Sequence, residues 1–293
     1  MPNYSVYGLT LRVPFEIQGA PVAVDGAPVD VDVVEGDVPF AVENPTAQGE
    51  GWQIADGVYL RRGGTRVGRF LVDGPATITY QRSEAAEEQI AAFLLMHDVM
   101  GAVLRYRGDL VLHANAVTLS RGSVIVSGES GAGKSTTTAG LLKRGGRLIT
   151  DDLSALRLET DGVVRVQPGL AELHLTSDSV AALNLDISAI EPFSWRAKTA
   201  MPHHGTAVTD AQPVTDIYLL TIVDDEELEF EQLVGSAAFE AMVESIYGPM
   251  LPAEHEGIFS LLSRVCLSLR VWSVRRPRGV WCHDELVERI VSG

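Results

Sequence analysis

Residues 124–135 read VIVSGESGAGKS, an apolar run followed at once by a glycine-rich loop and a lysine–serine pair. Residues 128–135 fit the Walker A pattern G-x-x-x-x-G-K-[ST], between a predicted strand and a predicted helix. Glycines let successive backbone amides turn toward phosphate oxygens, and the positive end of the following helix adds attraction. The pattern predicts a nucleotide phosphate site formed by Gly128, Glu129, Ser130, Gly131, Ala132, Gly133, Lys134, Ser135 and Thr136.

Two side chains of this loop carry specific chemistry. Lys134 can reach the outer phosphates of a nucleotide, and the hydroxyl of Ser135 can bind Mg²⁺. The expected cofactors are therefore ATP and Mg²⁺.

Asp151 and Asp152 follow a short predicted strand at residues 147–150. The helix after the loop climbs about 15 Å at 1.5 Å per residue, and a returning parallel strand recovers most of that distance. The acids should therefore lie beside the loop, where a carboxylate can accept a hydroxyl proton or hold Mg²⁺. A solvated turn that merely carries two acids is the alternative.

His113 precedes a predicted hairpin whose turn spans residues 120–122, so its cross-strand partner is expected near position 129 or 130. The imidazole would then lie against the loop. It either tunes the carboxylate or contacts a phosphate, or it is a core histidine with its hydrogen bonds satisfied, and both interpretations stay open.

Charge and composition exclude several classes of function. The formal net charge is −16, and lysines and arginines form no cluster, which argues against nucleic acid or an anionic membrane as partner. The N-terminus lacks a basic segment followed by an apolar run, and no stretch of 18 apolar residues occurs, so a cytoplasmic protein is expected. The chain has only two cysteines, so a disulfide framework is not expected and both are predicted to be reduced thiols.

The pattern along the chain predicts a fold of the α/β class in three parts. Short apolar alternations indicate a small β-rich unit over residues 1–82. An apolar stripe at helical spacing predicts a connecting helix over residues 83–108. Residues 109–293 then form the domain that carries the loop.

Three further features have weaker signals. The apolar run 217–223 followed by acids at 224–227 imitates the strand-then-acid pattern that holds Mg²⁺ in many P-loop proteins and is a rival to the aspartate pair, but the alternation at 228–233 favours a hairpin with a charged tip. Arg196 or Lys198 could stabilise charge on a transferred phosphoryl group. His203 and His204 lack companion ligands at metal spacing, so a surface loop is expected.

Residues 112–152, which run from LHANAV through SGESGAGKS to LITDD, resemble the catalytic core of the HPr kinase/phosphorylase family. The resemblance implies a P-loop kinase core of the HPr kinase/PEP carboxykinase type with a mixed sheet. It also implies that Asp151 is the general base, that Asp152 and His113 support it, that Lys134 acts on the phosphates, and that Ser135 and Asp152 hold Mg²⁺.

The likeness has limits. The later signature of that family is not found in residues 167–185, QPGLAELHLTSDSVAALNL, and the N-terminal unit does not resemble the regulatory domain of those enzymes. The layout, with YGLTLRV near the start and GRFLVDG before the long helix, is more similar to the HPr-kinase-like enzymes of lasso-peptide biosynthesis.

The expected function is an ATP-dependent kinase that phosphorylates a serine of a peptide or protein, with the C-terminal serine of a lasso precursor peptide as the finer hypothesis. A kinase of free serine or another small metabolite is one alternative. A nucleotide-binding switch, in which the aspartates only hold Mg²⁺, is the other. The partners expected are a peptide or protein substrate, without nucleic acid or membrane, and a homo-oligomer stays open.

Overall fold

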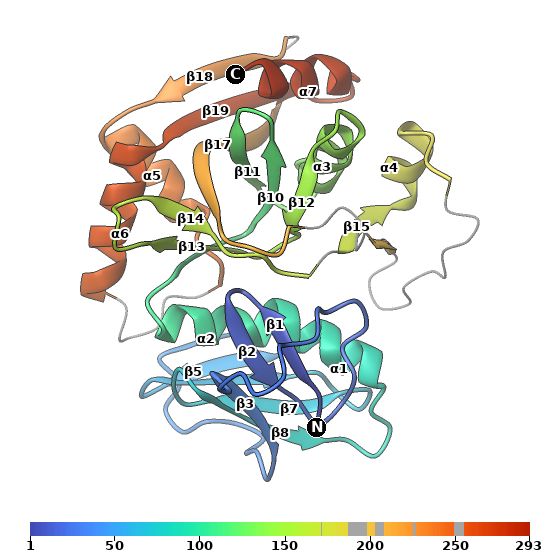
Figure 1. Cartoon of the computed structure of the whole chain (residues 1–293), viewed down its shortest axis with the longest axis vertical. Helices are drawn as coiled ribbons and strands as arrows, with labels where there is room; N and C mark the ends of the chain where they lie inside the picture. Colours follow the sequence, from blue (N-terminus) through green and yellow to red (C-terminus); the bar gives the residue numbers. More distant parts are fainter. Residues whose placement is uncertain (171, 187–197, 203–207, 225–226, 249–254) are drawn as a thin grey trace. The chain divides into compact units, whose positions relative to one another are not determined.

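The computed structural model describes residues 1–170, 172–186, 198–202, 208–224, 227–248 and 255–293 (Figure 1). The chain divides into two compact units. Unit 1 comprises Met1–Val111 and Tyr247–Ser260, and unit 2 comprises Leu112–Ile246 and Leu261–Gly293. None of the helices in these described ranges has the length and apolar character needed to cross a membrane.

Unit 1 is built on one β-sheet, which confirms the predicted β-rich N-terminal region. Over the described residues its strands follow the order β1-β2-β3-β8-β7-β6-β5-β4. Alternate side chains of the strands are buried, as in β2, because one face of the sheet is covered. The strands are β1 (Asn3–Val6), β2 (Leu9–Arg12), β3 (Val31–Glu35), β4 (Ala47–Gly49), β5 (Trp52–Ala55), β6 (Val58–Arg62), β7 (Gly68–Val72) and β8 (Thr77–Arg82).

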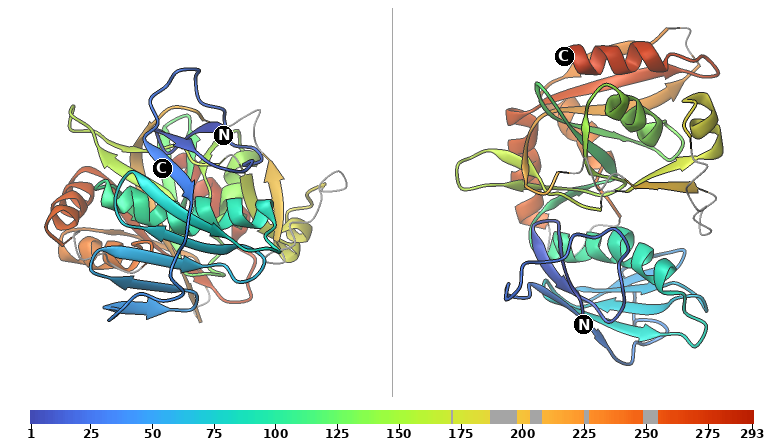
Figure 2. Two further views of the ribbon diagram at one scale, coloured as in Figure 1. Left: turned by 90° about the horizontal axis from the view of Figure 1, so that it is seen from below. Right: turned by 45° about the vertical axis from the view of Figure 1, so that its right-hand side comes forward.

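The predicted helix over residues 83–108 lies across this sheet but starts later and is not uniform (Figures 1 and 2). It consists of α1 (Glu88–Leu94), a π-helical turn η1 (Leu95–Val99) and α2 (Met100–Tyr106). Ser83 does not cap the helix, because its hydroxyl donates to the carbonyl of Thr65. The helix therefore begins about one turn downstream of the predicted start.

Unit 2 contains a mixed sheet, so the predicted mixed α/β class is confirmed. Over the described residues the main path runs β12-β10-β11-β17-β14-β13-β9, and β19 joins β17 to β18. The strands are β9 (Leu110–Leu112), β10 (Ala114–Leu119), β11 (Gly122–Gly128), β12 (Arg147–Thr150), β13 (Ser154–Leu158), β14 (Val164–Val166), β17 (Gln212–Val223), β18 (Glu229–Leu233) and β19 (Arg270–Pro277). A separate pair consists of β15 (Glu172–Thr176) and β16 (Lys198–Pro202).

The direction of the strands decides which ends meet. β11 pairs parallel with β17, and β17 pairs parallel with β19. β10 is antiparallel to both β11 and β12, so β12 runs in the same direction as β11. The carboxyl ends of β12, β11, β17 and β19 therefore share one edge of the sheet, in that order. This is the edge where open α/β sheets bind ligands.

The helices of unit 2 cover the sheet around the loop. The apolar side chains of β11 are fully buried and pack with α3 and α7 in one core, which includes Val124, Val126, Leu141, Leu286 and Ile290. α4 and the β15–β16 pair lie beside α3 (Figures 1 and 2). The helices are α3 (Lys134–Lys143), α4 (Ser177–Ala182), α5 (Ser236–Glu244) and α7 (His283–Ser292), and α6 (His255–Ser268) belongs to unit 2 from Leu261 onward.

Helix α3 ends in a left-handed conformation at its C-terminus. Gly145 has a φ of +88°, its amide donates to the carbonyl of Leu142, and the amide of Gly146 donates to that of Leu141. This pair of bonds is the Schellman motif, which satisfies the last carbonyls of the helix.

The predicted hairpin of residues 217–223 with 228–233 is wrong. β18 pairs antiparallel with β19, which lies between β17 and β18. The register at His113 is also one residue away from the prediction, since Leu119 pairs with Gly122 and Ala114 with Ser127. The tight turn has two residues instead of three, so His113 lies opposite Gly128.

Candidate functional site

The glycine loop connects β11 to α3 and depends on glycine at defined places. Gly128 has a φ of +148°, and a methyl group there would lie 2.5 Å from the carbonyl oxygen of Leu220 in β17. Gly133 has a φ of +99° and is the N-cap residue immediately before α3. Only glycine adopts such conformations without strain, so the loop is held in the tight path that presents its amides.

Lys134 is folded back over the loop. Its Nζ donates to the carbonyls of Gly128 at 2.8 Å and Glu129 at 3.3 Å, and the residue is buried. The amide of Ala132 donates to the Glu129 carbonyl at 3.1 Å and closes the turn of the loop. The ammonium group thus lies at the mouth of the loop, at the position where phosphate oxygens would replace backbone carbonyls as its partners.

The acidic pair forms a tight turn at the end of β12. The amide of Leu153 donates to the carbonyl of Asp151 at 2.7 Å, and Asp152 between them has a φ of +60°. The Thr150 hydroxyl donates to the Leu153 carbonyl at 2.8 Å and stabilises the turn. A non-glycine residue in this conformation is strained, and such strain is concentrated at functional sites.

Asp151 is held by His174, a residue that the sequence analysis missed. The amide and the imidazole Nδ1 of His174 lie 2.8 and 3.2 Å from Oδ2 of Asp151, and both residues are buried. Oδ1 of the same carboxylate is buried and has no hydrogen-bond partner among the described residues. The carboxylate therefore keeps one oxygen with free capacity to accept a hydrogen bond.

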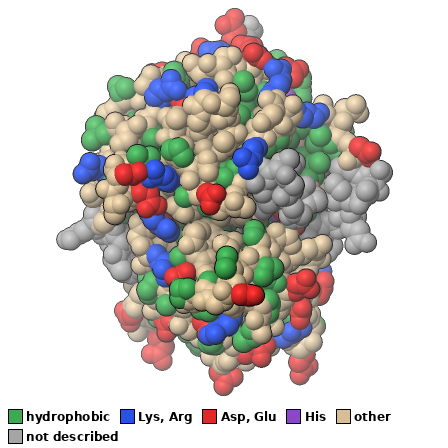
Figure 3. Space-filling model, in the orientation of Figure 1, with side chains coloured by type: hydrophobic (Ala, Val, Ile, Leu, Met, Phe, Trp, Pro, Cys, Tyr) green, Lys and Arg blue, Asp and Glu red, His purple; other side chains and the backbone are tan. Residues whose placement is uncertain are grey.

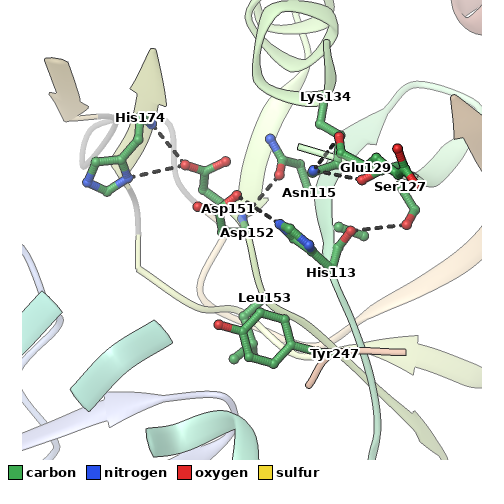
Figure 4. A network of polar contacts seen from close by, with 12 residues as sticks. His113, Asn115, Ser127, Glu129, Lys134, Asp151, Asp152, Leu153, His174 and Tyr247 are labelled. Atoms are coloured by element: carbon green, nitrogen blue, oxygen red, sulfur yellow. Dashed lines mark hydrogen bonds and ion pairs between the residues drawn. The ribbon is translucent and has the colours of Figure 1, made fainter. Parts of the chain in front are cut away.

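Asp152 has a different environment. Its Oδ1 lies 3.7 Å from Nε2 of His113, whose side chain is 40% exposed. Its amide donates to Oδ1 of Asn115 at 3.1 Å, and Nδ2 of Asn115 donates to the hydroxyl of Thr138 in α3 at 3.1 Å. Asn115 thus ties the acidic turn to the helix that follows the glycine loop (Figure 4).

The structure brings most of the predicted site residues to one edge of unit 2. In Figure 4, Asp151 and Asp152 lie between His174 on one side and Lys134 and His113 on the other. The signal for Asn115 was available, because it lies only two residues after His113, in the first strand of the predicted hairpin. His174 had no comparable local signal.

Arg276 of β19 is a second residue that the sequence analysis missed. Its Nη1 donates to the carbonyl of Ala132 in the loop, and a methyl group on Gly133 would collide with that same nitrogen. Its Nε is buried without a hydrogen-bond partner among the described residues. A guanidinium group therefore lies against the glycine loop on the side of β19.

The residues present fit a nucleotide with Mg²⁺. The loop offers its amides and Lys134, and Arg276 of β19 adds a second cation. Oδ1 of Asp151, which has no hydrogen-bond partner among the described residues, adds an oxygen that a metal or a hydroxyl could satisfy. Within the described ranges no group of three or more His, Cys, Asp or Glu side chains has metal-binding geometry. Mg²⁺ bound to nucleotide phosphates needs only one or two protein oxygens, which Ser135 and Asp152 can supply.

Some predicted features lie outside the described residues. These are Arg196, His203, His204, the side chain of Lys198 and the acids at 225–226. On the face of the molecule drawn in Figure 3, lysines and arginines are scattered among acidic side chains of the described residues. This face therefore presents no gathered basic surface of the kind that binds nucleic acid.

Comparisons with known proteins point to one group of enzymes. No family model matches the chain. A stretch of 53 residues, 18% of the chain, is 49% identical to the HPr kinase/phosphorylase of Clostridium botulinum strain Eklund 17B, and equally to that of strain Alaska E43. Among solved structures, the Hpr(Ser) kinase/phosphatase from Coxiella burnetii is similar with 15% identity and a TM-score of 0.33, over 62% of this chain and 93% of that one.

The extent of these matches is small. The chain spans 17% of the length of the two curated relatives. Over that segment, the chain shares homology with HPr kinase/phosphorylases.

Proposed function

We propose that this chain is an ATP-dependent kinase that transfers the γ-phosphoryl group to a serine hydroxyl of a peptide or protein. The observation that carries the proposal is the connection between the acidic turn and the glycine loop. Asn115 links the amide of Asp152 to Thr138 of α3, so the acids are held at a fixed place beside the phosphate loop. Positioning of this kind is the main source of catalysis in phosphoryl transfer.

The proposed roles follow from the environments of the two carboxylates. Asp151 has one oxygen that accepts hydrogen bonds from His174 and one without a partner among the described residues, which suits a base that takes the proton from the acceptor hydroxyl. Lys134 and the loop amides would neutralise the phosphates. Mg²⁺, held by Ser135 and Asp152 when bound, would offset charge on the transferred phosphoryl group. His113 lies next to Asp152 and would support it.

The acceptor is the finer part of the proposal. The layout of the whole chain resembles the HPr-kinase-like enzymes of lasso-peptide biosynthesis, and we propose the C-terminal serine of such a precursor peptide. The short homologous segment shared with HPr kinase/phosphorylases supports a protein or peptide serine in general.

The test is the variant Asp151→Asn, assayed with ATP labelled at the γ-position. The acceptor panel contains HPr, free serine, generic peptides and short peptides encoded beside the gene. We expect the variant to bind nucleotide normally while transfer falls by at least about 10²-fold, the usual contribution of general base catalysis. Asp210→Asn, which changes an exposed acid, is the control and should transfer normally.

Three results would count against the proposal. Equal rates of phosphoryl transfer by Asp151→Asn and the parent would rule out Asp151 as the general base. Phosphorylation of free serine alone would favour a small-metabolite kinase. Nucleotide-dependent stabilisation with no phosphorylated product from any acceptor would favour a nucleotide-binding switch.

A further inference from the structure

A cleft of about 280 Å³ lies beside the glycine loop, entirely within unit 2. Its floor is formed by Gly131, Gly133 and Thr136 at the start of α3, and one wall by α4. The opposite wall is the end of β19 and the segment after it, residues 276–281. The volume is close to the lower limit of typical small-molecule pockets, about 300 Å³, so the cleft can take part of a nucleotide.

The order of the strands places the acidic pair and the wall of the cleft formed by residues 276–281 on opposite sides of the loop. Along the sheet edge, β12 with the acids and β10 lie on one side of β11, and β17 and β19 lie on the other. Gly128 pairs with Leu220, and β17 then runs on to Val223, which pairs with Pro277 of β19. These two strands therefore extend past the start of the loop and form a wall beside it.

A nucleotide in the loop has two ends that must point in different directions. If the acids take the proton of the acceptor, the γ-phosphate lies on the β12 side. The phosphate chain then leads along the first turn of α3, past Thr136, and the nucleoside follows on the far side of the loop. We infer that the cleft between α4 and residues 276–281 binds the nucleoside, with the base packed on Trp281. This inference rests on the proposed function.

Arg276 and Trp281 are suited to two parts of this ligand. Arg276 contacts the loop at Ala132, and its buried Nε lacks a hydrogen-bond partner among the described residues, so it still has a donor for the phosphate nearest the sugar. Trp281 is 53% exposed at the cleft, although large aromatic side chains are usually buried. Its ring lies 5.1 Å from that of His283 at an angle of 35°. This contact supports the indole at the first turn of α7.

The experiment compares ADP with pyrophosphate, which has the same number of phosphates but no nucleoside. Binding of each to the full chain is measured by calorimetry in the presence of Mg²⁺. We expect Trp281→Ala to weaken ADP about tenfold or more, the scale of a lost base–aromatic stack, and to leave pyrophosphate unchanged. Trp281→Phe keeps an aromatic surface and should retain most of the ADP affinity.

Two further variants separate the parts of the cleft. Arg276→Ala should weaken both ligands, because the guanidinium would act on phosphate. Val234→Ala, an exposed apolar residue that does not line the cleft, should change neither. Melting temperatures in the absence of ligand show that each variant is folded.

The outcomes distinguish the cleft from the proposed kinase. Two results would overturn the nucleoside site while leaving the phosphate loop intact. One is an ADP affinity that Trp281→Ala leaves unchanged. The other is an equal affinity of the parent for ADP and for pyrophosphate. Tight ADP binding through Trp281 without phosphorylation of any acceptor would keep the nucleoside site and reject the kinase. Binding of neither ligand by the parent would reject both.

Discussion

The amide nitrogen and the imidazole Nδ1 of His174 lie 2.8 and 3.2 Å from the same oxygen of Asp151, Oδ2. The exposed fractions of the two residues are only 3% and 4%. Because one oxygen of the carboxylate accepts both hydrogen bonds, the orientation of the group is fixed and its other oxygen can still accept a hydrogen bond. His174 is therefore a positioning residue for the carboxylate that we propose as the base.

His174→Ala should lower the kcat for phosphoryl transfer by about 10²-fold, the cost of misplacing a reacting group by roughly 1 Å. The KM for ATP should change little, because His174 does not line the nucleotide cleft. Steady-state kinetics with the confirmed acceptor, together with ADP calorimetry, measure the two effects separately. A purely structural role would instead lower kcat, nucleotide affinity and the melting temperature together.

The double variant His174→Ala, Asp151→Asn provides the control for this prediction. If His174 acts only through Asp151, the double variant should be no slower than Asp151→Asn alone. Losses that multiply in the double variant would show that the two residues act independently.

Two glycines of the loop form a matched pair for a second prediction. A methyl group on Gly128 would lie 2.5 Å from the backbone carbonyl of Leu220, whereas the same group on Gly131 meets nothing within 4 Å. Both residues have a positive φ, +148° and +87°, so both substitutions bring conformational strain of about 1–3 kcal/mol. Only Gly128→Ala adds a collision with rigid backbone between β11 and β17.

We therefore expect Gly128→Ala to destabilise unit 2 clearly more than Gly131→Ala, and to remove the stabilisation by ADP. Chemical denaturation with and without ADP measures both effects. Equal destabilisation by the two substitutions would mean that the collision with Leu220 is relieved without cost. The loss of stability in both variants would then come entirely from local backbone strain.

The sequence was most informative where all determinants of a feature are close together. Residues 124–135 contain the strand, the glycines and the lysine, so the loop and the start of α3 could be predicted from that stretch. The Schellman end of α3 likewise depends on two adjacent glycines, Gly145 and Gly146. The turn at Asp151 could be placed because helix rise and strand rise are constant.

The features that were missed depend on partners far away in the sequence. His174 meets Asp151 across 23 residues and two sheets, and Arg276 meets Ala132 across 144 residues. β18 follows β17 closely in sequence but pairs with β19, because β19 inserts parallel to β17 and takes its free edge. Alternation of apolar and polar residues predicts that a strand exists, but it does not determine which other strand it pairs with.

A buried ion cluster at the other end of β17 gives a prediction about stability. Asp216 is completely buried and accepts hydrogen bonds from Arg121 at 2.6 Å, Arg270 at 2.9 Å and Trp272 at 3.0 Å. Arg121 also donates to the carbonyl of Ile290 in α7, so the cluster joins the sheet to the last helix. Removing one partner of such a cluster leaves a buried charge uncompensated.

Burial alone would raise the pKa of the Asp216 carboxyl, but the hydrogen bonds from Arg121 and its other donors outweigh it and hold the pKa below its ordinary value. A carboxyl with a lowered pKa in the folded state stabilises the fold above its unfolded pKa, about 3.9. That contribution is lost as the pH falls through the lower pKa of the folded state.

Asp216→Asn should therefore cost about 3 kcal/mol of unfolding free energy at pH 7, the scale for a broken buried pair. The difference from the parent should shrink as the pH falls below about 4, because the parent then loses the same ionic contribution. Urea unfolding at several pH values, followed by tryptophan fluorescence, measures the difference, and Trp272 beside Asp216 contributes to that signal.

Asp161→Asn, which removes an exposed ion pair with Arg165, is the control and should change stability little. A difference between Asp216→Asn and the parent that stays constant from pH 7 to pH 3 would show that Asp216 stabilises the fold through its shape and packing and not through its charge.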